Sequence, residues 1–226
     1  MQKKRLLVLS VDAMVHEDLS YLFSRPNFKR YMQGTSEVER VRTIYPSVTY
    51  PVHVSMLTGC YPDRHGIYSN FAFTTDSKED TWHWFAQDVK VEDILTVAKR
   101  AGYSTGSVFW PVTGRHPDVD YLIDEYWMPN ADDTLCGAFA RAGSCDAVLK
   151  IIARHENLMA ESHHKTGRTN VMVQPHIDDF LIACACDMIR EFQPEVMLVH
   201  NGIIDGTRHK HGVFNDCVTE GLDLVD

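Results

Sequence analysis

The chain has 226 residues, of which 44% are hydrophobic and 23% are charged, and it carries a formal net charge of −9. This is the composition of a globular protein whose core can be large enough to fold without cross-links. The acidic balance excludes a general binder of nucleic acid or of anionic membranes, because both attract basic surfaces. An acidic protein that handles phosphate must gather positive charge locally, and bound metal ions can supply it.

The six cysteines contain no CxxC pair and form no disulfide framework, which favours free thiols in a reducing compartment. The apolar start of the chain is too short for a signal peptide, because Asp12 interrupts it. No run approaches the ~20 apolar residues that a membrane helix needs. We therefore expect a soluble, cytoplasmic protein with no membrane partner.

The first part of the chain predicts a strand, a helix, a second strand and a second helix. Residues 5–11 are a short apolar run that ends at a polar residue, which predicts a fully buried strand. A loop and helix follow over residues 14–32, and the alternating residues 38–48 predict a short strand. A helix is expected over residues 51–57, with a proline at its start and Gly59 at its end.

The middle of the chain is more irregular. Residues 60–85 are rich in turns and aromatic side chains, which is typical of a loop that lines a site. An amphipathic helix is expected over residues 91–101 and a buried strand over 104–110. Residues 112–145 carry many Asp, Pro and Gly, and we expect an insertion or cap there.

The last part predicts a further helix, strand and helix pattern. Helices are expected over residues 145–155 and 175–192, a buried strand over 195–200, and a final helix from about Asn215. Strands that alternate with helices predict an α/β fold with a largely parallel sheet flanked by helices. The final helix has no C-terminal capping residue and no following strand, so we expect a chain that is cut short.

Two aspartates and a histidine follow the predicted strands. Asp12 follows the first strand directly, and Asp205 follows the third after a short loop, so both can reach the crevice at the carboxyl ends of the strands. His209 lies four residues after Asp205, a spacing that lets both side chains bind one metal ion. The alternatives are that Asp12 caps the next helix and that Asp205 is an ordinary loop carboxylate.

Thr49 precedes the helix that the proline at position 51 opens. A hydroxyl at a helix N-terminus lies where backbone N–H groups and the helix dipole favour a phosphate. An alcohol is a weak nucleophile without activation, and a metal ion can activate it as it does a bound water. The alternative is a threonine whose side chain simply caps the helix.

The order of these motifs resembles that of the nucleotide pyrophosphatase/phosphodiesterase branch of the alkaline phosphatase superfamily. Four positions depart from the family pattern: Ala13 and Arg208 stand where glycine is usual, and Met56-Leu57 stands where Leu-Val is usual. The matches are V-D-x-M at 11–14, P-x-x-T-[FY]-P at 46–51, T-G-x-Y-P-x-x-H-G-I at 58–67, asparagine at 70, F-W-P at 109–111, D-x-x-x-H at 205–209 and glycine at 212.

The resemblance implies an enzyme that uses two divalent metal ions, with zinc expected. By this resemblance Asp12 and Thr49 bind one ion, and Asp205 and His209 bind the other. Thr49 attacks phosphorus in line and forms a covalent phosphothreonine, which water then hydrolyses. Two ions about 4 Å apart can stabilise both the attacking and the departing oxygen, and phosphoryl transfer needs mainly such positioning and charge neutralisation.

The resemblance also implies substrate contacts. Asn70 donates to the phosphate oxygen on which charge develops. Tyr50 takes the place of an aromatic residue that stacks on a nucleobase or lines the leaving-group pocket, and Trp110 helps to line the pocket. For both rings the alternative is core packing. The substrate is then a small phosphodiester or nucleotide, and no stable nucleic-acid partner is expected.

The resemblance predicts an alkaline-phosphatase-like fold whose C-terminal part is missing, with residues 1–226 as an incomplete catalytic domain. The family takes further metal ligands from a later part of the chain, and no candidates follow residue 212, so we expect this fragment to bind metal weakly and to be inactive. The alternatives are a phosphomonoesterase or phosphonate hydrolase of the same fold, or a non-catalytic, degenerate nucleotide-binding module. A sulfatase is disfavoured, because Thr49 occupies the place of the Cys or Ser that sulfatases need. The sequence leaves the oligomeric state open.

Overall fold

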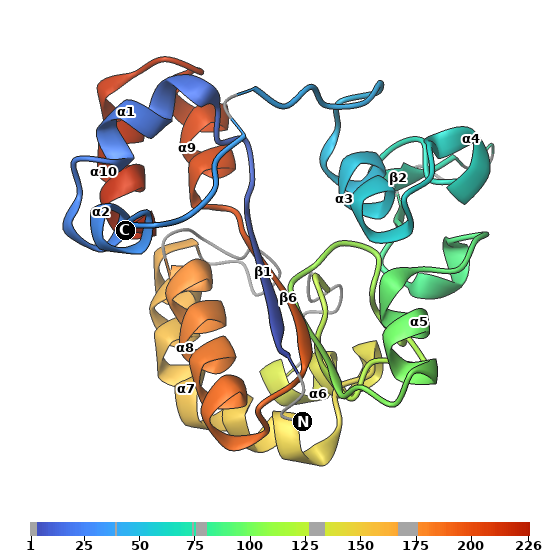
Figure 1. The fold of residues 1–226 in the computed structure, drawn as a ribbon. Helices are drawn as coiled ribbons and strands as arrows, with labels where there is room; N and C mark the ends of the chain where they lie inside the picture. Colours follow the sequence, from blue (N-terminus) through green and yellow to red (C-terminus); the bar gives the residue numbers. More distant parts are fainter. Residues whose placement is uncertain (1–3, 39, 74, 76–80, 127–133, 167–175) are drawn as a thin grey trace. The chain divides into compact units, whose positions relative to one another are not determined.

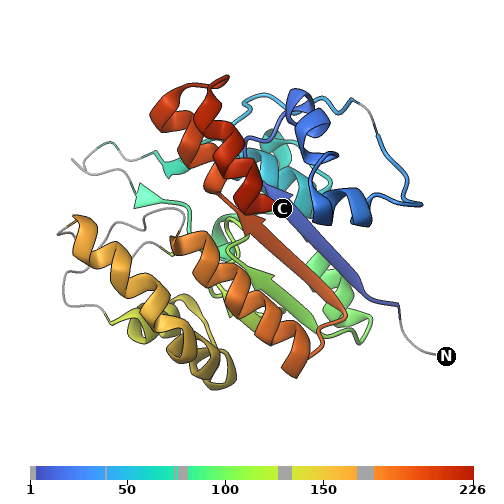
Figure 2. The same ribbon diagram turned by 90° about the vertical axis from the view of Figure 1, so that its left-hand side faces the viewer.

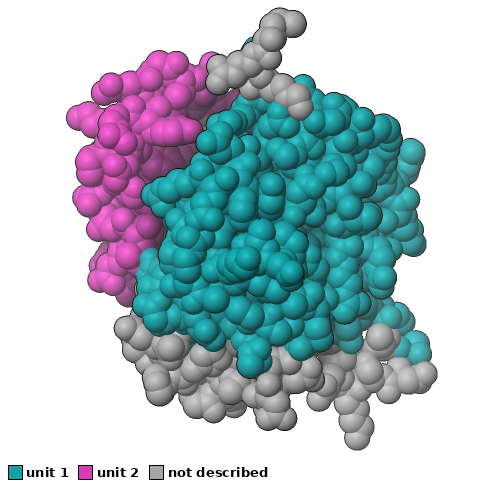
Figure 3. Space-filling view, turned by 90° about the horizontal axis from the view of Figure 1, so that it is seen from below, with its two compact units in different colours: residues 1–9, 44–200 teal, residues 10–43, 201–226 magenta. Residues whose placement is uncertain are grey.

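A computed structural model describes residues 4–38, 40–73, 75, 81–126, 134–166 and 176–226, and for 160–166 and 176 it describes the backbone only. The chain forms two compact units. The first unit contains residues 1–9 and 44–200, and the second contains residues 10–43 and 201–226 (Figure 3).

A four-stranded sheet of order β1-β6-β4-β5 forms the centre of the first unit (Figure 1). Strand β4 pairs in parallel with both β5 and β6. Strand β1 runs in the same direction as β6, because Leu6 N donates to Glu195 O at 2.8 Å and, six residues on, Asp12 N donates to Asn201 O at 2.9 Å. The strands are β1 (Leu6–Val11), β4 (Thr105–Val108), β5 (Tyr121–Ile123) and β6 (Val196–Asn201). The predicted α/β class with a parallel sheet is confirmed.

Helices cover both faces of this sheet, as parallel sheets require. Helices α7 (Asp146–Thr166) and α8 (His176–Glu191) cover one face, and α5 (Ile94–Arg100) lies on the other (Figure 1 and Figure 2). Consecutive residues of strand β6 belong to the cores on the two faces of the sheet, because successive side chains of a strand point to opposite faces. Met197 packs into the core beside α7 and α8, whereas Leu198 packs into the core that contains residues of α5.

Strand β1 is less buried than its apolar sequence predicts. Leu7 and Leu9 are each 53% exposed, whereas Val8 packs against the core of the opposite face. Leu6, on the same face as Val8, is 44% exposed, and no residue of β1 is fully buried, so the prediction of a fully buried first strand is wrong. The reason is its place at the edge of the sheet, where burial depends on what packs against the strand and not on its own sequence.

The alternating stretch 38–48 does not form the predicted strand in its described residues, 38 and 40–48. Val41 is 83% exposed and Tyr45 is 93% exposed, so the apolar side chains of this stretch find no buried face. Alternation alone predicted the strand, but a strand also needs a partner for its backbone groups.

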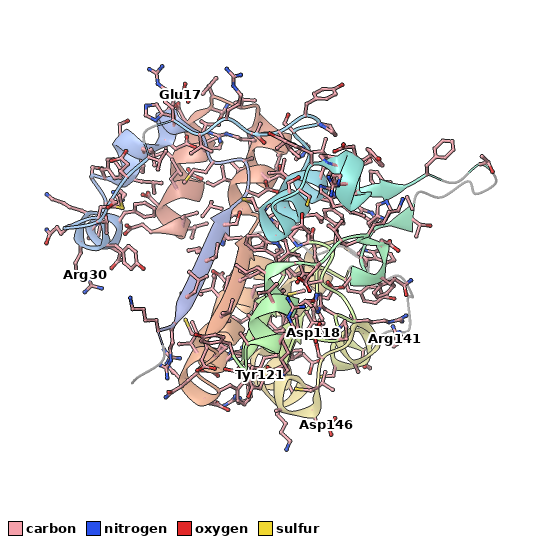
Figure 4. All side chains as sticks on the ribbon, turned by 45° about the vertical axis from the view of Figure 1, so that its right-hand side comes forward. Glu17, Arg30, Asp118, Tyr121, Arg141 and Asp146 are labelled. Atoms are coloured by element: carbon pink, nitrogen blue, oxygen red, sulfur yellow. The ribbon has the colours of Figure 1, made fainter. Side chains whose placement is uncertain are left out.

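Part of the segment 112–145, where we expected an insertion or cap, belongs to the main sheet. Strand β5 forms its edge beside β4 and carries Tyr121, which Figure 4 labels. The Tyr121 ring stacks on that of Phe192, with ring centroids 4.4 Å apart. Helix α6 (Leu135–Ala142) follows and places Phe139, which is fully buried, in the core with α7 and α8.

The remaining elements of the first unit carry the segment of greatest interest for function. They are α3 (Thr49–Thr58), α4 (Pro62–His65), the antiparallel pair β2 (Phe71–Ala72) and β3 (Thr81–Trp82), and the short 3₁₀ helix η2 (Ala86–Asp88).

The second unit is helical and joins two segments that lie far apart in the sequence. Its core contains Leu22 from the first segment and Ile204 and Leu222 from the second. Helix α10 begins where the sequence predicts, because the Asn215 side chain accepts from Cys217 N at 2.9 Å. The elements are η1 (His16–Asp18), α1 (Leu19–Leu22), α2 (Pro26–Tyr31), α9 (Ile203–His211) and α10 (Asp216–Val225).

The expected compartment depends on two features, the state of the cysteines and whether a helix could cross a membrane. All six cysteines are free. In the part of the chain that the structure describes, no helix combines the length and the apolar character needed to cross a membrane.

Candidate active site

Thr49 is the first residue of helix α3 and is half buried. The helix begins two residues before the predicted proline and ends at Gly59, whose φ of 68° is the left-handed conformation that favours glycine. The N-cap position belongs to Val48, and no side chain caps the helix from there. The alternative that Thr49 is the N-cap is therefore excluded, and its hydroxyl lies in the first turn of the helix.

Asn70 is held against this helix start, although it lies 20 residues further along the chain. Its Oδ1 accepts a hydrogen bond from Tyr50 N at 2.9 Å. A backbone N–H can only donate, so this bond fixes the orientation of the carboxamide and turns the NH₂ donor to the opposite side. The backbone is fixed as well, because His83 N donates to Asn70 O at 2.9 Å.

The helix start offers fewer backbone donors to an anion than its sequence suggests. The N–H of Tyr50 is engaged by Asn70, and Pro51 has none. A phosphate near Thr49 would therefore depend on side-chain donors and on bound cations more than on the backbone of this helix.

Tyr50 and Trp110, the two aromatic residues expected to contact substrate, are buried. Tyr50 has no exposed surface, and its ring lies 5.4 Å from that of Trp82. Trp110 is 2% exposed and packs in the core that also contains Leu57 and Leu95. In this conformation both rings have the packing role that was the alternative, and a contact with substrate would require either ring to leave its core.

Asp205 and His209 lie one turn apart on helix α9, and their side chains converge. The distance from Asp205 Oδ1 to His209 Nε2 is 3.5 Å, and the two side chains are 36% and 81% exposed. Two ligands of a tetrahedral zinc ion, each about 2.0–2.1 Å from the metal, lie about 3.3 Å apart. Asp205 and His209 thus have the donor atoms, the separation and the solvent exposure that two ligands of one zinc ion need.

Asp12 follows strand β1 and lies in a tight turn. Its Oδ1 accepts from Ala13 N at 2.9 Å, and Ala13 has a φ of 58°. The next helix, η1, has Val15 at its N-cap position, so the alternative that Asp12 is an N-cap is excluded. Because β1 and β6 are neighbouring parallel strands, Asp12 and helix α9 both follow the carboxyl ends of adjacent strands.

The predicted residues divide between the two units. Thr49, Tyr50, Asn70 and Trp110 belong to the first unit, and the predicted metal ligands Asp12, Asp205 and His209 belong to the second. Among the described residues, no three His, Cys, Asp or Glu side chains form a cluster that could hold a metal ion. Within the first unit the structure brings Asn70 to the helix that carries Thr49. Within the second it brings Asp205 and His209 together.

His53 is a residue near the predicted nucleophile that the sequence analysis missed. It is 3% exposed, and its Nδ1 lies 2.8 Å from Thr49 O. A carbonyl can only accept, so Nδ1 carries the proton and donates to it. The His53 ring also makes an edge contact with the ring of His200, with ring centroids 4.6 Å apart. The spacing of four residues from Thr49 was the signal that could have identified it.

His65 ties helix α3 to the segment that leads to Asn70. It is fully buried, and Ile67 N donates to its Nδ1 at 3.1 Å while its Nε2 lies 2.9 Å from Ser55 Oγ. Nδ1 must therefore be the unprotonated nitrogen. Burial lowers the pKa of His65, in agreement with this neutral form. These contacts give His65 a structural role.

Comparison with known sequences gives one family over nearly the whole chain. Residues 6–226 match the family described as type I phosphodiesterase/nucleotide pyrophosphatase. A bis(5'-adenosyl)-triphosphatase of Xenopus laevis, enpp4, is 31% identical over 111 residues, which are 47% of this chain and 24% of the relative. Human ectonucleotide pyrophosphatase/phosphodiesterase family member 1 is 35% identical over 95 residues, which are 36% of this chain and 10% of the relative.

Comparison with solved structures gives the same fold. Phosphonoacetate hydrolase from Sinorhizobium meliloti, solved with phosphonoacetate, has a TM-score of 0.62 at 17% identity and covers 98% of this chain. An inactive form of murine ectonucleotide pyrophosphatase/phosphodiesterase 5, solved with AMP, has a TM-score of 0.57 at 19% identity and covers 99% of this chain. The chain spans about half the length of these two proteins, 51% and 50%. The predicted alkaline-phosphatase-like fold, of which this chain contains about half, is confirmed.

Proposed function

Because the chain belongs to the type I phosphodiesterase/nucleotide pyrophosphatase family of hydrolases, we propose that it hydrolyses a phosphodiester or pyrophosphate bond of a nucleotide-like substrate, with Thr49 as the nucleophile. The bond between Tyr50 N and Asn70 Oδ1 is the observation that carries this proposal. It holds a fixed amide donor beside the first turn of the helix that bears Thr49.

The chain's own residues divide the work between nucleophile and charge stabilisation. The Thr49 oxygen attacks phosphorus in line as its proton is lost, and the bond from phosphorus to the departing alcohol or phosphate breaks. The threonine then carries the substituted phosphoryl group until water hydrolyses the new ester. The NH₂ group of Asn70, already oriented by Tyr50 N, donates to a phosphate oxygen as charge develops there. His53 holds the carbonyl of Thr49 at 2.8 Å and so restrains the first turn of the helix.

The metal ligands would be Asp12 and Thr49 for one ion and Asp205 and His209 for the other. The 3.5 Å spacing of Asp205 Oδ1 and His209 Nε2 supports the second assignment, and zinc is the ion that fits the carboxylate and imidazole donors. When bound, such ions favour deprotonation of an attacking hydroxyl and neutralise charge on phosphate oxygens.

The substrate class follows from the family and from two solved relatives. One relative was solved with AMP, which supports a nucleotide, and another is a phosphonoacetate hydrolase, which makes phosphonate hydrolysis the second candidate. The cytoplasm stays the expected location on the sequence pattern alone, in which the six cysteines contain no CxxC pair.

The test is hydrolysis of the p-nitrophenyl ester of thymidine monophosphate, compared with p-nitrophenyl phosphate and a p-nitrophenyl phosphonate. The chain is expressed both alone and with any coding sequence that adjoins it, and is supplied with zinc. Thr49→Ala and a chelator should each abolish turnover. Thr58→Ala is the matched control, because Thr58 lies at the other end of the same helix and donates to Val54 O.

Each outcome decides between the candidates. Faster turnover of the nucleotide ester than of the other two substrates supports the proposal, provided that Thr49→Ala abolishes this turnover and Thr58→Ala retains it. Preference for the phosphonate supports the second candidate. Inactivity of the 226 residues alone agrees with the expectation that they form an incomplete catalytic domain. Turnover that survives in Thr49→Ala would refute Thr49 catalysis. No turnover of any of the three substrates by the chain with its adjoining coding sequence would favour a non-catalytic nucleotide-binding module.

A further inference from the structure

The guanidinium of Arg208 lies at the centre of a set of hydrogen bonds in the second unit. Arg208 is on helix α9 between Asp205 and His209, and it is 8% exposed. Its Nη2 donates to both carboxylate oxygens of Asp18, at 2.8 and 3.0 Å, and its Nε donates to Val213 O at 2.9 Å. Its Nη1 donates to Ala13 O. One side chain thus holds one carboxylate and two backbone carbonyls.

These partners belong to the two segments that carry the predicted metal ligands. Ala13 directly follows Asp12 and lies in the same tight turn. Asp18 closes that turn region, because its Oδ2 also accepts from Val15 N at 2.8 Å. The remaining partner, Val213, follows the last turn of α9. The guanidinium therefore joins residues 12–18 to both the body and the end of helix α9.

Arg208 is buried, although it lies between two of the predicted ligands along helix α9. Its side chain is buried, whereas that of the neighbouring His209 is 81% exposed, as expected for consecutive residues about 100° apart around a helix. The described hydrogen bonds of its guanidinium go to Asp18, Val213 and Ala13 and to none of the three predicted ligands. Arg208 therefore acts on the metal site through these partners.

We propose that Arg208 is a positioning residue for the metal site, and that its guanidinium fixes the turn containing Asp12 against the helix containing Asp205 and His209. This inference rests on the proposed function, because it assumes that these three side chains bind metal. It extends that function to a residue that the sequence showed only as a departure from a family glycine.

Arginine is the side chain that this arrangement requires. Its planar fork presents five N–H donors in fixed directions, and here they reach a carboxylate and two carbonyl oxygens at once. A lysine has one nitrogen at the end of a flexible chain, so it can keep the charge near Asp18 but cannot keep all three connections. The substitution Arg208→Lys thus retains the positive charge and removes the fixed set of hydrogen bonds.

The first experiment measures zinc affinity of the full chain by competition with a low-affinity zinc indicator. For Arg208→Lys we expect the dissociation constant to rise by about tenfold or more, the usual effect of removing a group that orients metal ligands from behind. Arg25→Lys is the matched control, since Arg25 pairs with Asp223 at 2.9 Å in the same unit. We expect it to leave zinc affinity unchanged.

The second experiment needs no metal. Amide hydrogen exchange of residues 12–18 should be faster in zinc-free Arg208→Lys than in the wild-type chain, and unchanged in Arg25→Lys. Circular dichroism confirms that each variant is folded. If Arg208→Lys does not fold, Asp18→Asn takes its place, because it weakens the same connection and leaves the arginine in position.

The results separate this inference from the proposed function. Faster exchange at residues 12–18 together with weaker zinc binding supports the inference. If Asp205→Asn abolishes zinc binding while Arg208→Lys binds as tightly as wild type, Arg208 is not a positioning residue and the proposed metal site stands. If neither the wild-type chain nor the chain expressed with any adjoining coding sequence binds stoichiometric zinc, the metal site of the proposed function is wrong and this inference fails with it.

Discussion

The substitution Asn70→Asp should separate catalysis from stability. An aspartate keeps an oxygen that can accept from Tyr50 N, 2.9 Å away in the wild type, and its charge lies near the N-terminus of helix α3. A negative charge there contributes about 0.3–1 kcal/mol of stability at an exposed site. The same change removes the amide donor and places a negative charge beside the expected phosphate. Loss of one such donor costs about 2.7–4 kcal/mol of transition-state stabilisation, or about 10²–10³ in kcat.

Urea denaturation measures the free energy of unfolding. Turnover is measured per folded molecule, on whichever form of the chain is active, alone or with its adjoining coding sequence. We expect the free energy of unfolding of Asn70→Asp to equal or slightly exceed that of wild type, and kcat to fall by about 10²–10³. Thr134→Ala is the control, because Thr134 Oγ1 caps helix α6 by accepting from Gly137 N at 3.0 Å. That variant should lose about 1 kcal/mol of stability and keep its kcat. Unchanged turnover in Asn70→Asp would refute the role assigned to the amide donor.

Three further predictions concern pH, zinc and the backbone. Burial lowers the pKa of His65 below its ordinary 6.5, so the unfolded chain takes up the proton first. The free energy of unfolding should therefore fall as the pH drops below 6.5, and urea titrations should show less of this fall in His65→Gln. His209→Ala should weaken zinc binding without lowering the thermal midpoint of the zinc-free chain, since the side chain is 81% exposed, and calorimetry with and without zinc checks both. Gly59→Ala should lower the free energy of unfolding by about 1 kcal/mol, because an alanine is strained at a φ of 68° and its added Cβ meets no atom within 4 Å. A larger loss of stability in urea titrations would mean that packing also matters.

Elements whose limits depend on nearby residues were predicted well. Gly59 ends helix α3 and Asn215 caps helix α10, because each signal acts within a few residues. Strands β4 and β6 were predicted from their apolar runs and are fully buried, since they are the two inner strands of the sheet. In these cases the sequence and the tertiary structure favour the same conformation.

Features that depend on distant partners were not predicted. The apolar residues of β1 gave no sign that Leu7 and Leu9 would be exposed at a sheet edge. The burial of Tyr50 depends on Ile67 and Val112, which lie on other segments. For Arg208 the sequence showed only an unusual residue in a motif, because its carboxylate partner Asp18 is 190 residues away.

The composition of the second unit has a consequence for biosynthesis. Its core joins Leu22 to Ile204 and Leu222, so its two segments, residues 10–43 and 201–226, are separated by the whole of residues 44–200. A nascent chain emerges from its N-terminus onward. The apolar side of the first segment must therefore wait on the ribosome, uncovered, until the second segment has been translated. Chaperones that bind exposed apolar surface would meet this unit before its predicted metal ligands are complete.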